Sequence, residues 1–161
     1  MNPWTILLGT ISILNQKFKM LVDTNIFIYA INADSPKYKR AQKFLKDNQV
    51  KLEISHQNVL EAIRVLTHKS FSRPMTLKHA LKAVLVIIKS CFLISPNQST
   101  YYFAIELIKN YKLSGNRIFD AYLAATALSN GIDTIATDNT RDFKKFKEIK
   151  LLNPFPQKTH N

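Results

Sequence analysis

Short apolar runs alternate with longer amphipathic segments along most of the chain. The apolar runs predict strands over residues 19–23, 51–55, 91–95, 132–137 and 149–152, and we expect the first and fourth of these to be buried. The segments between and before them predict helices over residues 26–31, 37–46, 57–69, 77–90, 99–111 and 118–128. Strands that alternate with helices form parallel sheets covered on both faces. We therefore expect an α/β fold in three layers (α/β/α), with a mainly parallel central sheet of roughly five strands.

One predicted helix, residues 118–128, is almost wholly apolar and carries a single carboxylate. Only Asp120 and Thr126 interrupt its apolar side chains, so we expect both of its faces to be largely covered. A buried carboxylate is costly unless something pairs with it. Asp120 is therefore a candidate functional residue.

The predicted helix over residues 57–69 is amphipathic. We expect its core-facing side chains to be Val59, Leu60, Ile63 and Leu66. Glu61 lies on the polar stripe, where an ion pair with Arg64 three residues later would account for it. Periodicity alone therefore does not single out Glu61.

Further acidic residues follow the ends of predicted strands. Asp23 ends the first strand, whereas Asp138 and Asp142 follow the fourth. Ligands of open parallel sheets bind at the carboxyl ends of the strands, and there Asp120 and Glu61 can join these acids. Carboxylates that close together do not all ionise without help. The oxygen ligands favour a hard divalent cation, Mg²⁺ or Mn²⁺.

Composition limits the class of protein and of partner. The 161 residues are 46% apolar, which indicates one domain with a real core, and carry a net charge of +12, which favours association with a polyanion or with an acidic partner. A single cysteine, Cys91, excludes an internal disulfide and fits a reducing compartment, so we expect a cytoplasmic protein.

The first 19 residues differ from the rest of the chain. Their apolar run, residues 6–14, is too short to span a bilayer, and no basic residue precedes it as in a secretory signal. We expect residues 1–19 to be an appended segment upstream of a natural start at Met20, or alternatively a hydrophobic tail that docks on a partner. Residues 20–155 then form the domain, residues 156–161 form a polar tail, and no membrane association is expected.

Four segments in order carry a resemblance to a known family: MLVDTNIFIYA, ISHQNVLEAIRVLTHKSFSRPMTLKHAL, RIFDAYLAATALSNG, and IATDNTRDFKKF followed by LLNPF. Together they resemble the PIN-domain ribonucleases, and most closely the VapC toxins of type II toxin–antitoxin pairs. The resemblance covers residues 20–155. A lone Asp-Thr-Asn is weak evidence, but four segments in this order and at these separations are specific.

The resemblance implies roles for individual residues. It implies that Asp23, Glu61 and Asp120 are metal-site acids with a catalytic role. Asp142, Asp138 and Asn139 compete for the fourth position, and we favour Asp142, with Asp138 as the alternative. The hydrogen-bonding residues expected to support the site are Thr24, Asn25, Thr137 and Asn139. Arg117 and Arg141 are expected to bind phosphate, or alternatively to be solvent-exposed loop charges.

The same resemblance implies a function. It predicts Mg²⁺- or Mn²⁺-dependent hydrolysis of RNA phosphodiester bonds, a VapB-like antitoxin as partner, and a homodimer. Tyr101, Tyr102 and Phe103 would serve a dimer face, although we expect them to pack in the core. Two alternatives remain open: an RNA-processing PIN nuclease without an antitoxin, and a non-catalytic RNA-binding module.

Overall fold

The computed structural model describes residues 18–155 and contains a five-stranded, fully parallel sheet. Its strands are β1 (Met20–Val22), β2 (Leu52–Ser55), β3 (Phe92–Ile94), β4 (Thr134–Ala136) and β5 (Lys150–Leu152). Their spatial order is β3-β2-β1-β4-β5. Strand order therefore reverses between β1 and β4, the position where α/β sheets bind ligands. The predicted parallel α/β/α architecture is confirmed.

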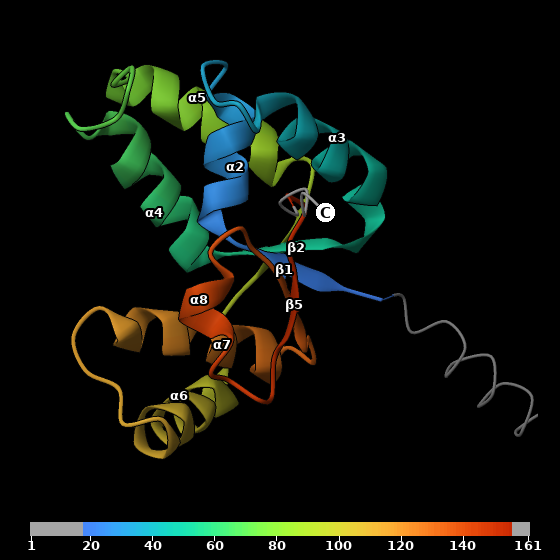
Figure 1. Cartoon of the computed structure of the whole chain (residues 1–161), viewed down its shortest axis with the longest axis vertical. Helices are drawn as coiled ribbons and strands as arrows, with labels where there is room; N and C mark the ends of the chain where they lie inside the picture. Colours follow the sequence, from blue (N-terminus) through green and yellow to red (C-terminus); the bar gives the residue numbers. More distant parts are fainter. Residues whose placement is uncertain (1–17, 156–161) are drawn as a thin grey trace, which may run out of the picture.

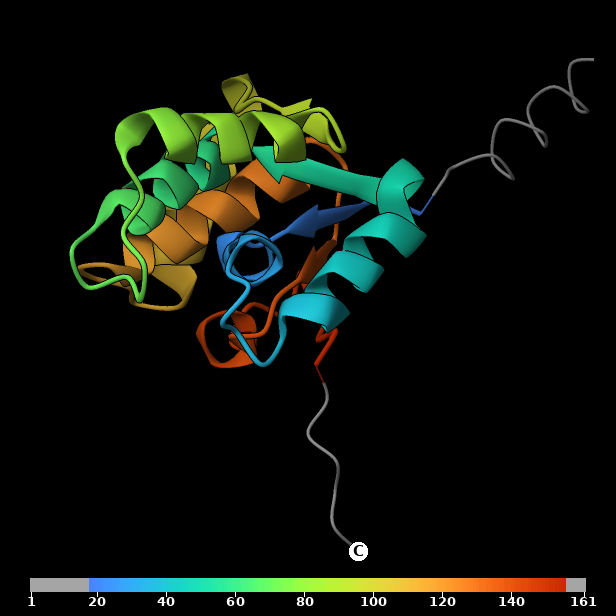
Figure 2. The same cartoon turned by 90° about the horizontal axis from the view of Figure 1, so that it is seen from above.

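Helices cover both faces of this sheet (Figures 1 and 2). One layer consists of α2 (Thr24–Ile31), α3 (Tyr38–Asn48), α4 (His56–Thr67) and α5 (Leu77–Ile88). The opposite layer consists of α6 (Gln98–Asn110) and α7 (Arg117–Ser129). Two short helices complete the described chain: η1 (Gln49–Lys51) before β2, and α8 (Thr140–Phe143) after β4. The sequence did not predict α8.

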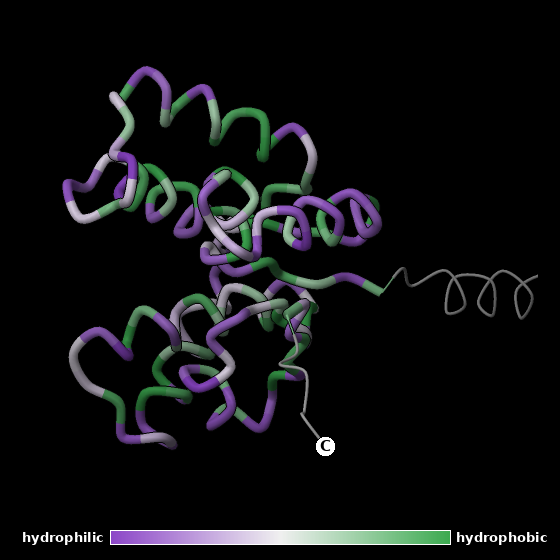
Figure 3. The backbone as a smooth tube through the Cα atoms, turned by 45° about the horizontal axis from the view of Figure 1, so that its top comes forward, coloured by the Kyte–Doolittle hydropathy of each residue, from purple (hydrophilic) through white to green (hydrophobic). Residues whose placement is uncertain are grey.

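Alternate residues of the strands point to opposite faces of the sheet and pack into a separate hydrophobic core on each face. Met20 and Val22 of β1 pack in the core with α2 and α3, whereas Leu21 packs in the core with α6 and α7. This alternation is the period of a strand whose two faces are both covered. The backbone coloured by hydropathy shows the matching pattern in the helices, whose hydrophobic and hydrophilic stretches alternate (Figure 3). No helix among residues 18–155 has the length and hydrophobicity needed to cross a membrane.

Three expectations about hydrophobic burial are wrong. Leu60 on α4 is 68% exposed rather than core-facing. On α7, Ile118 and Phe119 are exposed, so the first turn of that helix is not covered on both faces. The aromatic side chains expected in the core, Tyr101, Tyr102 and Phe103, are exposed on α6. In each case the helix is buried through its other side chains, and no other described residues cover these positions.

An ion pair joins Lys19, just before β1, to Glu53 of β2. Lys19 Nζ lies 2.9 Å from Glu53 Oε1, and Glu53 of β2 is only 2% exposed. Lys19 therefore compensates a buried carboxylate in the centre of the fold. Residues 1–17 and 156–161 lie outside the described residues, so the predicted appended segment and polar tail stay predictions.

Candidate metal centre

Asp23 lies at the carboxyl end of β1 and is 9% exposed. It is the N-cap of α2, where its Oδ1 accepts a hydrogen bond of 2.7 Å from the Thr24 backbone N–H. Its Oδ2 accepts from Asn25 Nδ2 at 2.6 Å and from Thr137 Oγ1 at 2.7 Å. Burial raises the pKa of Asp23 to about 6, despite these hydrogen bonds, and the charges of Glu61 and Asp120 add to the rise.

Thr137 follows β4 and joins the two sides of the switch point between β1 and β4. Its hydroxyl donates to Asp23 and accepts from Asn25 Nδ2 at 3.1 Å and from the Asn139 N–H at 3.0 Å. Asn25 Oδ1 in turn accepts from the Asp138 N–H at 3.2 Å. The segment after β4 is therefore bound to the start of α2 through side chains that all contact Asp23 or its neighbours.

Glu61 is held in place from the start of α4. Ser55 and Asn58 form a reciprocal capping box there, which fixes the fully buried Asn58 side chain. Asn58 Nδ2 donates to Thr24 Oγ1 at 3.1 Å, and Thr24 Oγ1 donates to Glu61 Oε2 at 2.9 Å. Glu61 Oε1 also lies 3.6 Å from Arg64 Nη2, which confirms the expected ion pair. Sequence analysis missed Asn58, although an amide three residues after a capping serine is the available signal.

Asp120 occupies the first turn of α7, where the positive end of the helix dipole favours an acid. Burial raises the pKa of Asp120 to about 6, and the charges of Asp142 and Glu61 raise it further. Lys145 and Arg117 act in the opposite direction. The acids of four elements therefore interact electrostatically at one edge of the sheet.

The structure separates the two candidates for the fourth acid. Asp142 on α8 accepts a hydrogen bond from Asn139 Nδ2, and its charge acts on Asp120. Asp138 instead accepts from Tyr29 Oη at 2.9 Å and forms an ion pair with Lys37. The carboxylate of Asp138 is therefore already paired, whereas Asp142 lies within electrostatic reach of Asp120.

The acidic side chains of the described residues do not form a ligand cage. Within the described part of the chain, no three His, Cys, Asp or Glu side chains lie close enough together to hold one ion. The donor set itself, oxygen-only and anionic, suits Mg²⁺ or Mn²⁺.

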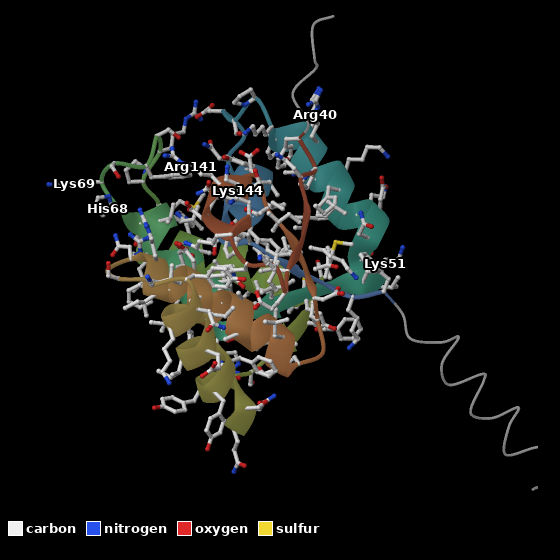
Figure 4. The ribbon with its side chains drawn as sticks, turned by 60° about the horizontal axis from the view of Figure 1, so that its bottom comes forward. Arg40, Lys51, His68, Lys69, Arg141 and Lys144 are labelled. Carbon is white, nitrogen blue, oxygen red and sulfur yellow. The ribbon has the colours of Figure 1, made fainter. Side chains whose placement is uncertain are left out.

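Basic side chains surround this edge. Arg117 begins α7, and Arg141 lies on α8; both are exposed. Figure 4 shows Arg141 and Lys144 at α8, with His68 and Lys69 in the loop after α4, whereas Lys51 lies near the start of β2. Lys145, which lowers the pKa of Asp120, was not predicted from the sequence.

A comparison with known families matches residues 20–149 to the PIN domain. The chain belongs to the PIN-domain family. The resemblance inferred from the four sequence segments is therefore confirmed at the level of the family. In this PIN domain, the order of the five strands and the acids near their carboxyl ends define the candidate site.

Curated relatives of this PIN domain include VapC ribonuclease Mb2897 of Mycobacterium bovis. It is 27% identical over 147 residues, which cover 88% of this chain and 99% of the relative. Ribonuclease VapC24 of Mycobacterium tuberculosis is 25% identical over 137 residues, which cover 83% of this chain and 94% of the relative. Both relatives are therefore matched over nearly their whole length.

Solved structures share the fold. A DNA-bound VapBC from Salmonella typhimurium aligns with a TM-score of 0.66 at 20% identity, over 86% of this chain and 99% of that chain. VapC20 of Mycobacterium tuberculosis, described as a toxin that cleaves the sarcin–ricin loop, aligns with a TM-score of 0.61 at 17% identity, over 82% and 99%. At these identities the likeness establishes the fold alone.

Proposed function

We propose that this PIN-domain protein is a divalent-metal-dependent ribonuclease and the toxin of a VapBC-like toxin–antitoxin pair. The observation that carries the proposal is that Asp23, Glu61, Asp120 and Asp142 lie within electrostatic reach of one another at one edge of the sheet. They come from the end of β1 and from α4, α7 and α8, which no local sequence pattern brings together. The curated relatives named ribonucleases support the same activity.

The chemistry of the donor set fits a hard divalent cation. Burial and like charges raise the pKa values of Asp23 and Asp120 to about 6, so a cation that binds there relieves an existing electrostatic cost. The four acids would hold the ion. A bound Mg²⁺ neutralises phosphate charge and lowers the pKa of a coordinated water.

The remaining residues orient the acids and bind the substrate. Thr24 holds one oxygen of Glu61, and Thr137 with Asn25 holds Oδ2 of Asp23, so these carboxylates keep fixed directions. Arg117 and Lys145 supply positive charge for RNA phosphates beside Asp120, and the exposed Arg141 of α8 adds to it. In the reaction, water attacks phosphorus and gives up a proton, while the bond to the leaving oxygen breaks and that oxygen takes up a proton from solvent.

A separate apolar surface suits the antitoxin partner. A cavity of about 400 Å³ opens between α2, α3 and α5, lined mainly by apolar side chains such as Ile31, Leu45 and Val86. Leu81 and Leu85, also on α5, are exposed. We propose that an apolar helix face of the antitoxin covers this surface, because side chains at helical spacing can fill the cavity.

The activity is tested by sequencing the RNA ends that the full-length protein produces with Mg²⁺ present. We expect specific cleavage that EDTA abolishes and that Asp120→Asn lowers by at least about 100-fold. Asp133→Asn is the matched control. Asp133 also belongs to the α7–β4 region but is paired with Lys150, away from the site, so cleavage should be unchanged.

Two outcomes would change the proposal. Metal-dependent cleavage that survives Asp120→Asn would contradict the assigned site. A toxin should arrest growth when it is expressed, and a small adjacent gene should relieve that arrest. RNA cleavage without growth arrest would favour an RNA-processing nuclease over a toxin.

A further inference from the structure

The carboxylate of Asp138 joins three segments that are distant in sequence. Its Oδ2 accepts a hydrogen bond of 2.9 Å from Tyr29 of α2. It also forms an ion pair with Lys37, the residue that precedes α3. The side chain of Asp138 is only 16% exposed and that of Lys37 35%. Asp138 therefore binds the loop after β4 to the layer formed by α2 and α3.

Two aromatic rings lie beside the ammonium group of the ion pair. Lys37 Nζ lies 4.9 Å from the ring centroid of Tyr29 and 5.4 Å from that of Phe155. These two rings pack edge to face with centroids 5.6 Å apart. A pair shielded in this way is screened less by water and salt than an exposed pair, so it restrains the segments it joins more strongly.

The backbone on both sides of Asp138 leads to the candidate metal centre. The Asp138 N–H donates to Asn25, and the Asn139 N–H donates to Thr137, both of which contact Asp23. The Asn139 side chain then donates to Asp142. A displacement of Asp138 would therefore move the loop that carries the proposed fourth acid.

We propose that Asp138 is a positioning residue, held by Tyr29 and Lys37, that fixes residues 137–142 so that Asp142 stays beside Asp120. The effect of this positioning on catalysis rests on the proposed function, whereas the restraint of residues 137–142 does not. The rival interpretation is that Asp138 is itself a metal ligand and that Lys37 must leave before the ion binds. The two interpretations predict opposite effects of removing Lys37.

The first experiment tests the restraint without any metal or RNA. Amide hydrogen exchange of the full chain reports local opening of residues 137–142. We expect Lys37→Met and Asp138→Ala to speed exchange in this loop at least about tenfold while exchange in β1 and β2 is unchanged. Lys43→Met is the control, because it removes an exposed ion pair with Asp47 on the same helix. Unchanged loop exchange in both variants would overturn the proposal, whether or not the protein is a nuclease.

The second experiment measures Mn²⁺ affinity by calorimetry. Removing a group that orients a metal ligand costs about 10–100-fold in affinity. We expect that loss for Lys37→Met and Asp138→Ala, a smaller loss for Asp138→Asn, which still accepts from Tyr29, and no loss for Lys43→Met. Adding Asp138→Ala to Asp142→Ala should produce no further loss, because Asp138 acts through Asp142.

The results separate this proposal from the proposed function. A rise in Mn²⁺ affinity on Lys37→Met would overturn the positioning role and make Asp138 a ligand. If loop exchange speeds as expected in the variants while the wild-type protein binds no Mn²⁺, the restraint is supported and the result counts against the nuclease.

Discussion

Asp23 loses most of its contact with water when the chain folds, and its carboxylate then depends on Thr24, Asn25 and Thr137 for hydrogen bonds. The sequence identified Asp23 as a strand-end acid, and the family resemblance connected it with Glu61 and Asp120. Sequence analysis missed Asn58, Tyr29 and Lys37, whose partners in the site lie 34, 109 and 101 residues away. Contacts over such separations exist only once the sheet has assembled.

The first prediction follows from the raised pKa of Asp23. The folded value is about 6 against 3.8 for the ordinary group, so folding favours the protonated form. This stabilising contribution is complete below pH 4 and is lost as pH rises through 6. Relative to metal-free wild type, the free energy of unfolding of Asp23→Asn should therefore rise by up to about 3 kcal/mol between pH 4 and pH 8.

Urea unfolding of both proteins in EDTA at a series of pH values measures this difference. Comparing the change with pH removes any constant effect of the substitution on hydrogen bonding. If the difference in unfolding free energy between Asp23→Asn and the wild type stays constant from pH 4 to pH 8, burial does not raise the pKa of Asp23.

Among the elements, the hydrophobic pattern predicted all five strands and the six longer helices, because each has a strong apolar face. It did not predict α8, whose four residues are too few to show a period. It also placed Leu60 in the core, because Leu60 lies next to apolar positions of α4 that are core-facing. The sequence also did not predict the ion pair of Glu53 in β2, because a glutamate in a strand gives no sign that Lys19 will pair with it.

The Lys19–Glu53 pair gives the second prediction. Lys19→Met leaves the buried Glu53 carboxylate without its cation and should lower the free energy of unfolding by about 1–3 kcal/mol. Lys150→Met is the matched control, since it removes an ion pair with Asp133 in which both side chains are at least half exposed, and it should cost at most about 1 kcal/mol. Thermal or denaturant unfolding at pH 7 compares the two. Equal costs would mean that Lys19 makes only a surface contact.

Across the whole molecule, the distribution of exposed side chains bears on assembly. Tyr101 and Tyr102 of α6 are 65% and 69% exposed and pack edge to face with ring centroids 5.6 Å apart. Phe103 and Phe119 are exposed on the same helical layer. Helical periodicity does not show which apolar face of a helix lies on the core, so the sequence favoured core packing for Tyr101, Tyr102 and Phe103 and gave a dimer face only as the alternative. We propose that these aromatic residues form the face of the expected homodimer, because exposed aromatic side chains mark protein interfaces.

The third prediction tests this assembly. The double variant Tyr101→Ser, Tyr102→Ser should have the mass of a monomer by light scattering at concentrations where the wild type is a dimer. Val50→Ser, which changes a side chain that is 60% exposed before β2, should stay dimeric. A wild-type monomer, or a double variant that remains a dimer, would exclude this face.

The account depends on one shared ion between acids from β1, α4, α7 and α8. Crystals grown with Mn²⁺ and measured at the manganese absorption edge locate that ion directly. We expect an anomalous peak within ligand distance, about 2.0–2.3 Å, of carboxylate oxygens of Asp23 and Asp120, with Glu61 or Asp142 bound directly or through water. No peak between these side chains at saturating Mn²⁺, or one beside Asp138 with Lys37 displaced, would contradict the site described above.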